Sequence, residues 1–235
     1  EFVRRAGGVD ESLHYMMDYD LWLRIGKTCK AYKHPDLLGC FRLCGGTKSH
    51  DQKEKFWLEQ IRIYDKLAQR TDLSEAERAL LPRAYGRAHW LTGLEFYVKG
   101  EREPAMAYCT KAVDHYDLLA DDLDYMTRRL VFIGHRYHLD EPIAMIEAFL
   151  DDLDRRTRTG IRKLARKSRG MLYASRMFQA YQTGSRKSAR ADLLRAVAYD
   201  PGRLRDRGVI SAGMDLLLGE RLAGAFKRLA RSDTD

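Results

Sequence analysis

From residue 51 to the end of the chain, apolar residues recur at helical spacing almost without interruption. In the stretch QKEKFWLEQIRIYDKLAQR, one helical face carries Trp57, Ile61, Tyr64 and Leu67. Ser74 is followed three residues later by Glu77, which is the spacing of a capping box at the start of a helix. This pattern predicts that the chain is mainly α-helical.

Other signals predict where later helices begin and end. Asp140 stands in the position of an N-cap, and Pro142 falls in the first turn that follows it. Apolar periodicity predicts further helices at about 170–182, 185–199, 203–218 and 220–230.

Two helical stretches, WLTGLEFYVKGEREPAMAYCTKAVDHYD and MFQAYQTGSRKSARADLLRAVAYDP, are similar to tetratricopeptide repeats. After Gly100 and Gly184, small or apolar residues follow at the same offsets: Ala105, Cys109 and Ala112 in the first stretch, Ala189, Leu193 and Ala196 in the second. Both stretches depart from the repeat pattern. The first has Asp117 where the second has Pro201, and the second has Met177 and Ala180 where the first has Gly93 and Phe96. We therefore predict an all-helical, hairpin-based domain over residues 51–235.

The first fifty residues have a different character, because glycines divide them into short segments. The sequence DYDLWLRIG predicts a short helix that ends at Gly26, with Leu21, Trp22 and Ile25 on one face and Trp22 in the core. A turn at residues 34–36 separates two short runs that have the composition of strands. We interpret residues 1–50 as a piece of an α/β domain.

The net charge of +8 is unevenly distributed over the 235 residues. Twelve Lys and Arg residues and no Asp or Glu lie between Arg155 and Arg190, while residues 117–124 and 151–154 are acidic. The basic segment can bind an anionic membrane surface or a protein partner, or it can be a solvated face that pairs with the acidic segments. Nucleic acid is the less favoured partner, because no aromatic-interleaved or groove-reading motif accompanies the charge.

The composition narrows the class of protein. No run of about 18 apolar residues is present to span a membrane, and the opening EFVRRAGG does not have the pattern of a secretory signal. The chain does not start with methionine, so we expect Glu1 to follow from processing or from a cut in a longer reading frame. The four cysteines are Cys29, Cys40, Cys44 and Cys109. Free thiols in a cytoplasmic protein are favoured over a zinc site of Cys40 and Cys44 with His34 or His50.

The opening fifty residues carry the sequence Gly-Gly-x-Asp-Glu, a spacer, Asp-Tyr-Asp-Leu-Trp-Leu-Arg, and Phe-Arg before Gly-Gly-Thr-Lys-Ser. This stretch resembles the C-terminal half of the catalytic domain of family 2 glycosyltransferases, which have the GT-A fold. The resemblance implies a bacterial-type enzyme that moves a sugar, with inversion, from a nucleotide-diphosphate donor to a glycan, lipid-linked or protein acceptor. It implies a short α/β remnant of that domain at residues 1–50.

The resemblance also implies roles for particular residues. Asp18 matches the base that takes the proton from the acceptor hydroxyl, and Met17 stands where the family usually has Glu. A helix N-cap is the alternative role for Asp18. Asp20 is expected to pair with Arg24 at the i+4 position. The residues expected on the substrate side are Gly7, Gly8, Asp20, Arg24, Arg42 and Lys48.

A divalent metal, Mg²⁺ or Mn²⁺, is implied for the full-length parent enzyme. Cys44 occupies the position of the family's metal-binding histidine, and a thiol is a poor ligand for these hard ions. The nucleotide-binding half with its Asp-x-Asp motif is not found in this chain, so we expect the chain alone to bind no metal and to be inactive. A non-enzymatic helical adaptor with a decayed glycosyltransferase remnant is the alternative function. The expected location is cytoplasmic, including the inner face of the membrane.

Overall fold

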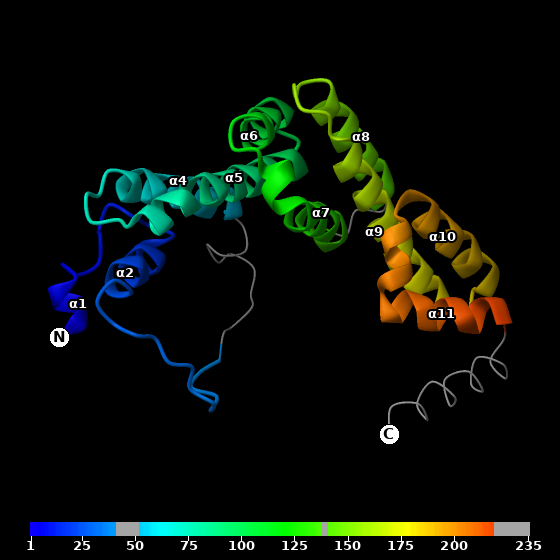
Figure 1. Cartoon of the computed structure of the whole chain (residues 1–235), viewed down its shortest axis with the longest axis horizontal. Coiled ribbons are helices and arrows are strands. Elements are labelled where there is room, and N and C mark those ends of the chain that lie inside the picture. The colour runs from blue at the N-terminus through cyan, green and yellow to red at the C-terminus, as the bar shows by residue number, and fades with distance from the viewer. Residues whose placement is uncertain (41–51, 138–140, 219–235) are drawn as a thin grey trace. The chain divides into compact units, whose positions relative to one another are not determined.

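A computed structural model of the chain describes residues 1–40, 52–137 and 141–218. The described residues form helices and connecting loops, which confirms the prediction of a mainly α-helical chain (Figure 1). Contacts divide the chain into two compact units, Glu1–Leu118 and Leu119–Asp235. The predicted boundary near residue 50 lies inside the first unit, where loop and helix contacts connect residues on either side of it.

The first unit is built from α1 (Phe2–Arg5), α2 (Met17–Ile25), α4 (Lys53–Ala68), α5 (Glu75–Val98) and α6 (Arg102–Asp114). The helices α4, α5 and α6 pack in chain order, each against the next. The predicted capping box is present at the start of α5: the Ser74 hydroxyl accepts from the Glu77 amide, and the Glu77 carboxylate accepts from the Ser74 amide at 2.8 Å. Trp90, Leu94 and Met106 are among the fully buried core residues.

Small residues set the distance between α5 and α6. A Cβ atom placed on Gly93 would lie 2.3 Å from the Cys109 Sγ and 2.7 Å from the Ala105 carbonyl oxygen. Cys109 and Ala105 are themselves completely buried. The predicted close approach of these two helices is therefore confirmed, because only a residue without a side chain fits at position 93.

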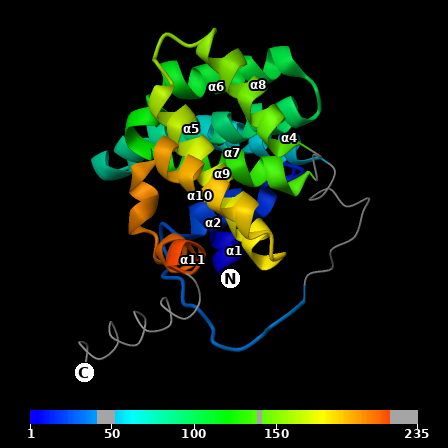
Figure 2. The same cartoon turned by 90° about the vertical axis from the view of Figure 1, so that its right-hand side faces the viewer.

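The second unit contains α7 (Leu118–Arg136), α8 (Pro142–Asp154), α9 (Arg162–Gln182), α10 (Arg186–Tyr199), the 3₁₀ helix η1 (Pro201–Arg205) and α11 (Arg207–Leu218). Figures 1 and 2 both show α9 and α10 side by side as a helical hairpin. The core between them and α11 is made of Ala174, Met177, Ala189, Leu193, Ala196, Val209, Ala212 and Leu216. Met177, at the place of Gly93 in the first stretch, fills this core, while Gly170 is the glycine that lets α9 approach Asp200 closely.

The helix pairs α5–α6 and α9–α10 are hairpins with the same turn between their helices. Gly100 and Gly184 have left-handed φ angles of 81° and 76°. After each glycine, the next amide returns to a helix carbonyl five residues back: Glu101 to Phe96 at 3.0 Å, and Ser185 to Ala180 at 2.8 Å. This closure of a helix end requires a left-handed residue, which glycine provides without strain. The shared offsets in the sequence therefore correspond to a shared backbone turn.

Several local predictions are wrong. Two strand-like runs are predicted within residues 30–43, but no strand forms in the described part of this stretch, which ends at residue 40. It has no neighbouring strand among the described residues to share its backbone hydrogen bonds. The α/β remnant is thus not seen in the described residues. Glu141, not Asp140, is the N-cap of α8, and Asp140 lies outside the described residues. The predicted helix at 203–218 is divided at Asp206 into η1 and α11.

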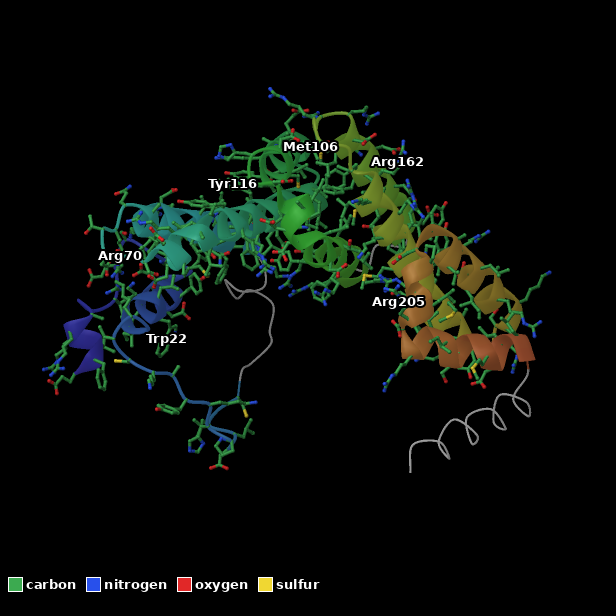
Figure 3. The ribbon with its side chains drawn as sticks, in the orientation of Figure 1. Trp22, Arg70, Met106, Tyr116, Arg162 and Arg205 are labelled. Atoms are coloured by element: carbon green, nitrogen blue, oxygen red, sulfur yellow. The ribbon has the colours of Figure 1, made fainter. Side chains whose placement is uncertain are left out.

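Trp22 is also not a core residue. Trp22 is 64% exposed, whereas Leu21 is buried. Successive helical residues point about 100° apart. When Leu21 faces the interior of the first unit, Trp22 therefore faces outward. Figure 3 labels Trp22 on α2. The predicted end of the helix at Gly26 is confirmed, since Gly26 caps α2.

Candidate functional site

The segment from Ala6 to Ile25 is organised by Arg24. Its guanidinium donates to the Asp20 carboxylate from Nε at 3.0 Å and from a terminal amino group at 2.8 Å. The same side chain donates to the Gly8 carbonyl at 2.8 Å and to the Ala6 carbonyl. Arg24 thus binds the Gly-Gly turn to the helix that follows it, and the predicted Asp20–Arg24 pair is confirmed.

The glycines in this turn have a conformational role. Gly7 and Gly8 have φ angles of 84° and 75°, a region that L-amino acids with a side chain rarely adopt. Their conformation turns the backbone so that the carbonyls of Ala6 and Gly8 both face Arg24. Four of the predicted site residues, Gly7, Gly8, Asp20 and Arg24, therefore lie together.

Asp18 does not join this cluster. It lies in the first turn of α2, behind an N-cap at Met16, so the alternative role as N-cap is wrong. Its carboxylate is exposed and accepts the adjacent Tyr19 amide at 2.7 Å. A carboxylate in the first turn of a helix is favoured by the partial positive charge of the helix N-terminus. Among the described residues, Asp18 has no cationic partner.

Two hollows border Arg24. One of about 570 Å³ is lined by Phe2, Arg5, Ala6, Arg24, Lys27, Thr28, Cys29, Arg70 and Asp72. The other, of about 360 Å³, is lined by Gly7, Gly8, Asp10, Asp20, Arg24, Lys66, Leu67 and Arg70. Asp18 lines neither of them. The geometry therefore separates the predicted base from the hollows that Arg24 borders.

Charges around these hollows are already matched in pairs. Lys27 contacts Glu77 at 2.8 Å, Arg70 contacts Asp72 at 2.7 Å, and Lys66 contacts Asp10. The hydrogen bond from Arg70 lowers the pKa of Asp72 to about 2, so this carboxylate is charged at neutral pH. Arg70 could not be anticipated from the sequence, because it lies after α4 and nothing in the chain near it indicates that it borders the same hollows as Arg24.

A buried glutamate anchors the start of α2. Glu59, which is 7% exposed, accepts the backbone amides of His14, Tyr15 and Met16 at 2.8, 2.7 and 2.9 Å. Burial raises the pKa of Glu59, but the three amide hydrogen bonds outweigh burial and lower the pKa below its ordinary value. The sequence carries no signal for this contact, because more than forty residues separate Glu59 from the three residues whose amides it accepts.

Arg42, Cys44 and Lys48 lie outside the described residues. Within the described ranges, no group of three or more His, Cys, Asp or Glu side chains gathers where it could hold a metal ion. Asp20 is occupied by Arg24, and Asp18 stands apart from it. The described residues therefore do not form the divalent-metal site that the resemblance implies.

No family model, curated protein or solved structure matches this chain. Among the described helices, none is both long and apolar enough to cross a membrane.

Proposed function

We propose that residues 1–50 form the acceptor side of a family 2 glycosyltransferase domain. In this proposal Asp18 takes the proton of the acceptor hydroxyl while the nucleotide diphosphate leaves the donor sugar. The sequence resemblance motivates the proposal, and the state of Asp18 supports it. In the described residues, Asp20 is occupied by two hydrogen bonds from Arg24. Within the same residues, the Asp18 carboxylate accepts only the Tyr19 amide, keeps free lone pairs and faces solvent.

The remaining residues of the segment would position this base. Arg24 fixes α2 against the Gly7-Gly8 turn, and Glu59 fixes the loop that leads into α2. Both contacts limit the movement of the first turn of α2, where Asp18 lies. Asp20 and Arg24 thus act as positioning residues, and the chain binds the donor and a glycan, lipid-linked or protein acceptor only as part of the complete domain.

Exposed apolar residues support the existence of a further covering segment. Residues 30–40 are exposed throughout, with Tyr32 at 87% and Leu37 at 88%, and Trp22 is exposed on α2. A segment of this composition is expected to pack against another surface. We propose that the nucleotide-binding half of the domain provides that surface and supplies the ligands for the implied Mg²⁺ or Mn²⁺.

The reading frame that encodes the residues before Glu1 tests this proposal. We expect about a hundred codons that include an Asp-x-Asp motif after a predicted strand. A preceding frame that encodes no such motif, or a frame that starts immediately before Glu1, would contradict a glycosyltransferase parent.

A non-enzymatic adaptor is the second candidate, and one observation favours it. The predicted base lines neither of the hollows beside Arg24, while α5–α6 and α9–α10 form helical hairpins with the same turn geometry. Helical hairpins of this kind commonly present binding surfaces. An adaptor predicts that Asp18→Asn leaves partner binding unchanged, whereas substitutions on the basic face of α9 reduce it.

A further inference from the structure

The basic helix α9 has a face on which arginine and tyrosine side chains follow one another. Arg162, Arg166, Arg169, Tyr173 and Arg176 are separated by four, three, four and three residues, so they lie along one side of the helix. Arg195 and Tyr199 join them from α10. We call these seven residues the Arg–Tyr stripe; at 1.5 Å per residue it is about 21 Å long. Figure 3 labels Arg162 on α9.

The ring faces of the two tyrosines of the stripe are covered by each other and by arginine side chains. Their rings are stacked with centroids 5.6 Å apart and planes 2° from parallel. Arg169 covers the Tyr199 ring at 5.8 Å, and Arg176 and Arg195 cover the Tyr173 ring at 5.7 and 5.6 Å. Because the ring faces are occupied by each other and by guanidinium groups, they offer little room for a nucleobase to stack.

The guanidinium groups remain able to bind an anion. Asp192, with a side chain 4% exposed, is shared by Arg176 at 3.3 Å and Arg195 at 3.4 Å, so one carboxylate faces two cations. Arg166 uses Nε to reach the Tyr199 carbonyl, and within the described residues Arg162 has no partner. Arg169 is held by Glu147. Among the described residues, the five arginines of the stripe therefore contact only two carboxylates, those of Glu147 and Asp192.

Charge is most nearly balanced at the start of the stripe. Asp151 and Asp154 line a hollow of about 310 Å³ together with Arg162, Arg166 and Arg169. The excess positive charge is thus largest around Arg176 and Arg195. The Arg176 and Arg195 side chains are held in place by their rings and by Asp192, and they are 40% and 56% exposed, so part of each guanidinium group stays accessible to a further carboxylate.

We propose that the Arg–Tyr stripe binds an acidic peptide segment of a partner protein. The excess positive charge around Arg176 and Arg195 is complementary to the carboxylates of an acidic segment, and the covered rings disfavour single-stranded nucleic acid. The stripe itself presents no aliphatic side chain that would insert into a lipid surface. This proposal is independent of the proposed glycosyltransferase function, since every residue of the stripe lies in the second unit.

Binding of a fluorescent octaglutamate peptide to the whole chain tests the proposal, with an oligouridylate and phosphatidylserine vesicles as competing ligands. Asp192→Asn releases both arginines and is expected to tighten peptide binding about threefold. The triple variant R176Q/D192N/R195Q leaves no buried charge and is expected to weaken binding about tenfold. Lys187→Gln is a control off the stripe with the same net change of charge, and it should stay within about twofold.

Thermal unfolding of each variant would show that the fold is retained. Equal weakening by the triple variant and by Lys187→Gln would overturn the proposal, since general charge would then explain binding. Absence of peptide binding, or tighter binding of the oligouridylate or the vesicles, would overturn it as well.

Discussion

Arg24 holds Asp20 through two hydrogen bonds, of 3.0 Å from Nε and 2.8 Å from a terminal amino group, and reaches the carbonyls of Ala6 and Gly8 with its remaining donors. The fork shape of the guanidinium makes this possible, because its donors diverge in one plane. One side chain therefore connects the Gly-Gly turn with α2.

Replacing Arg24 by Lys should destabilise the first unit although the charge is kept. An ammonium group cannot serve the carboxylate and two carbonyls in this geometry, so we expect a loss of about 2 kcal/mol in the free energy of unfolding. Arg5→Lys is the matched control, since the Arg5–Glu1 pair is largely exposed and should change stability by less than about 0.5 kcal/mol. Urea denaturation measures both, and equal effects would show that Arg24 has no special role.

Gly93→Ala should disturb the packing of α5 on α6. The added methyl group would meet the Cys109 Sγ at 2.3 Å and the Ala105 carbonyl at 2.7 Å, and a backbone atom cannot move without shifting a helix. We expect a loss of roughly 3 kcal/mol, as for other overpacked cores. Gly39→Ala is the control, because no atom lies within 4 Å of its added Cβ. A Gly93→Ala variant as stable as the control would contradict the close approach.

Glu59→Gln should weaken the anchor of α2 and alter the response to acid. The wild-type chain should be more stable than the variant by about 2 kcal/mol at neutral pH, because three amides donate to a charged acceptor. The folded pKa of Glu59 is lowered, so this advantage is present above the unfolded value of about 4.5 and is lost as the pH falls through the folded pKa.

Unfolding curves at several pH values would show that loss. Glu11→Gln serves as the control, since Glu11 is exposed. If the wild-type advantage over Glu59→Gln persisted unchanged at pH 2, the carboxylate would not be the anchor.

His89 should make the first unit sensitive to mild acid. It is 3% exposed, neither ring nitrogen has a hydrogen-bond partner, and its ring stacks between Tyr108 and Tyr116 at 5.5 and 5.3 Å. Burial, with a smaller contribution from Lys111, lowers the pKa of His89 to about 4. His89 is therefore protonated near pH 6.5 in the unfolded chain but only near pH 4 in the folded chain. The free energy of unfolding decreases as the pH falls across this window, because the unfolded chain binds more protons.

The expected loss is on the order of 2–3 kcal/mol between these pH values. His89→Phe should remove most of this dependence, whereas replacing the exposed His135 with Gln should leave it intact. An NMR titration that places the His89 pKa near its ordinary value would contradict the assignment.

Contacts between neighbours in the sequence were predictable, and contacts between distant residues were not. The Ser74–Glu77 capping box, the Asp20–Arg24 pair and the Gly26 cap involve residues at most four apart, or one helix end, and all three are confirmed. The predicted pairing of basic with acidic segments also occurs, as Lys167 contacts Asp124. The contact of Glu59 with residues 14–16 and the place of Arg70 beside the hollows that Arg24 borders could not be anticipated, because only folding brings these distant parts of the chain together.

The Arg–Tyr stripe illustrates the same limit. Five of its seven residues are visible in the spacing along α9, but Arg195 and Tyr199 come from α10, so the sequence alone does not show the stacked tyrosine pair or the arginines that cover it. Likewise, helical periodicity placed Trp22 beside Leu21 and Ile25 without indicating how much of that face is covered.

The most direct test of the proposed function is the release of nucleoside diphosphate from a panel of nucleotide sugars by the complete protein that contains this chain. Asp18→Asn should lower the rate of transfer at least about a hundredfold, as expected for loss of a general base, while the unfolding temperature stays the same. Asp20→Asn, in contrast, should lower activity together with stability. An Asp18→Asn variant that retains the wild-type rate would contradict the assignment of Asp18 as the base.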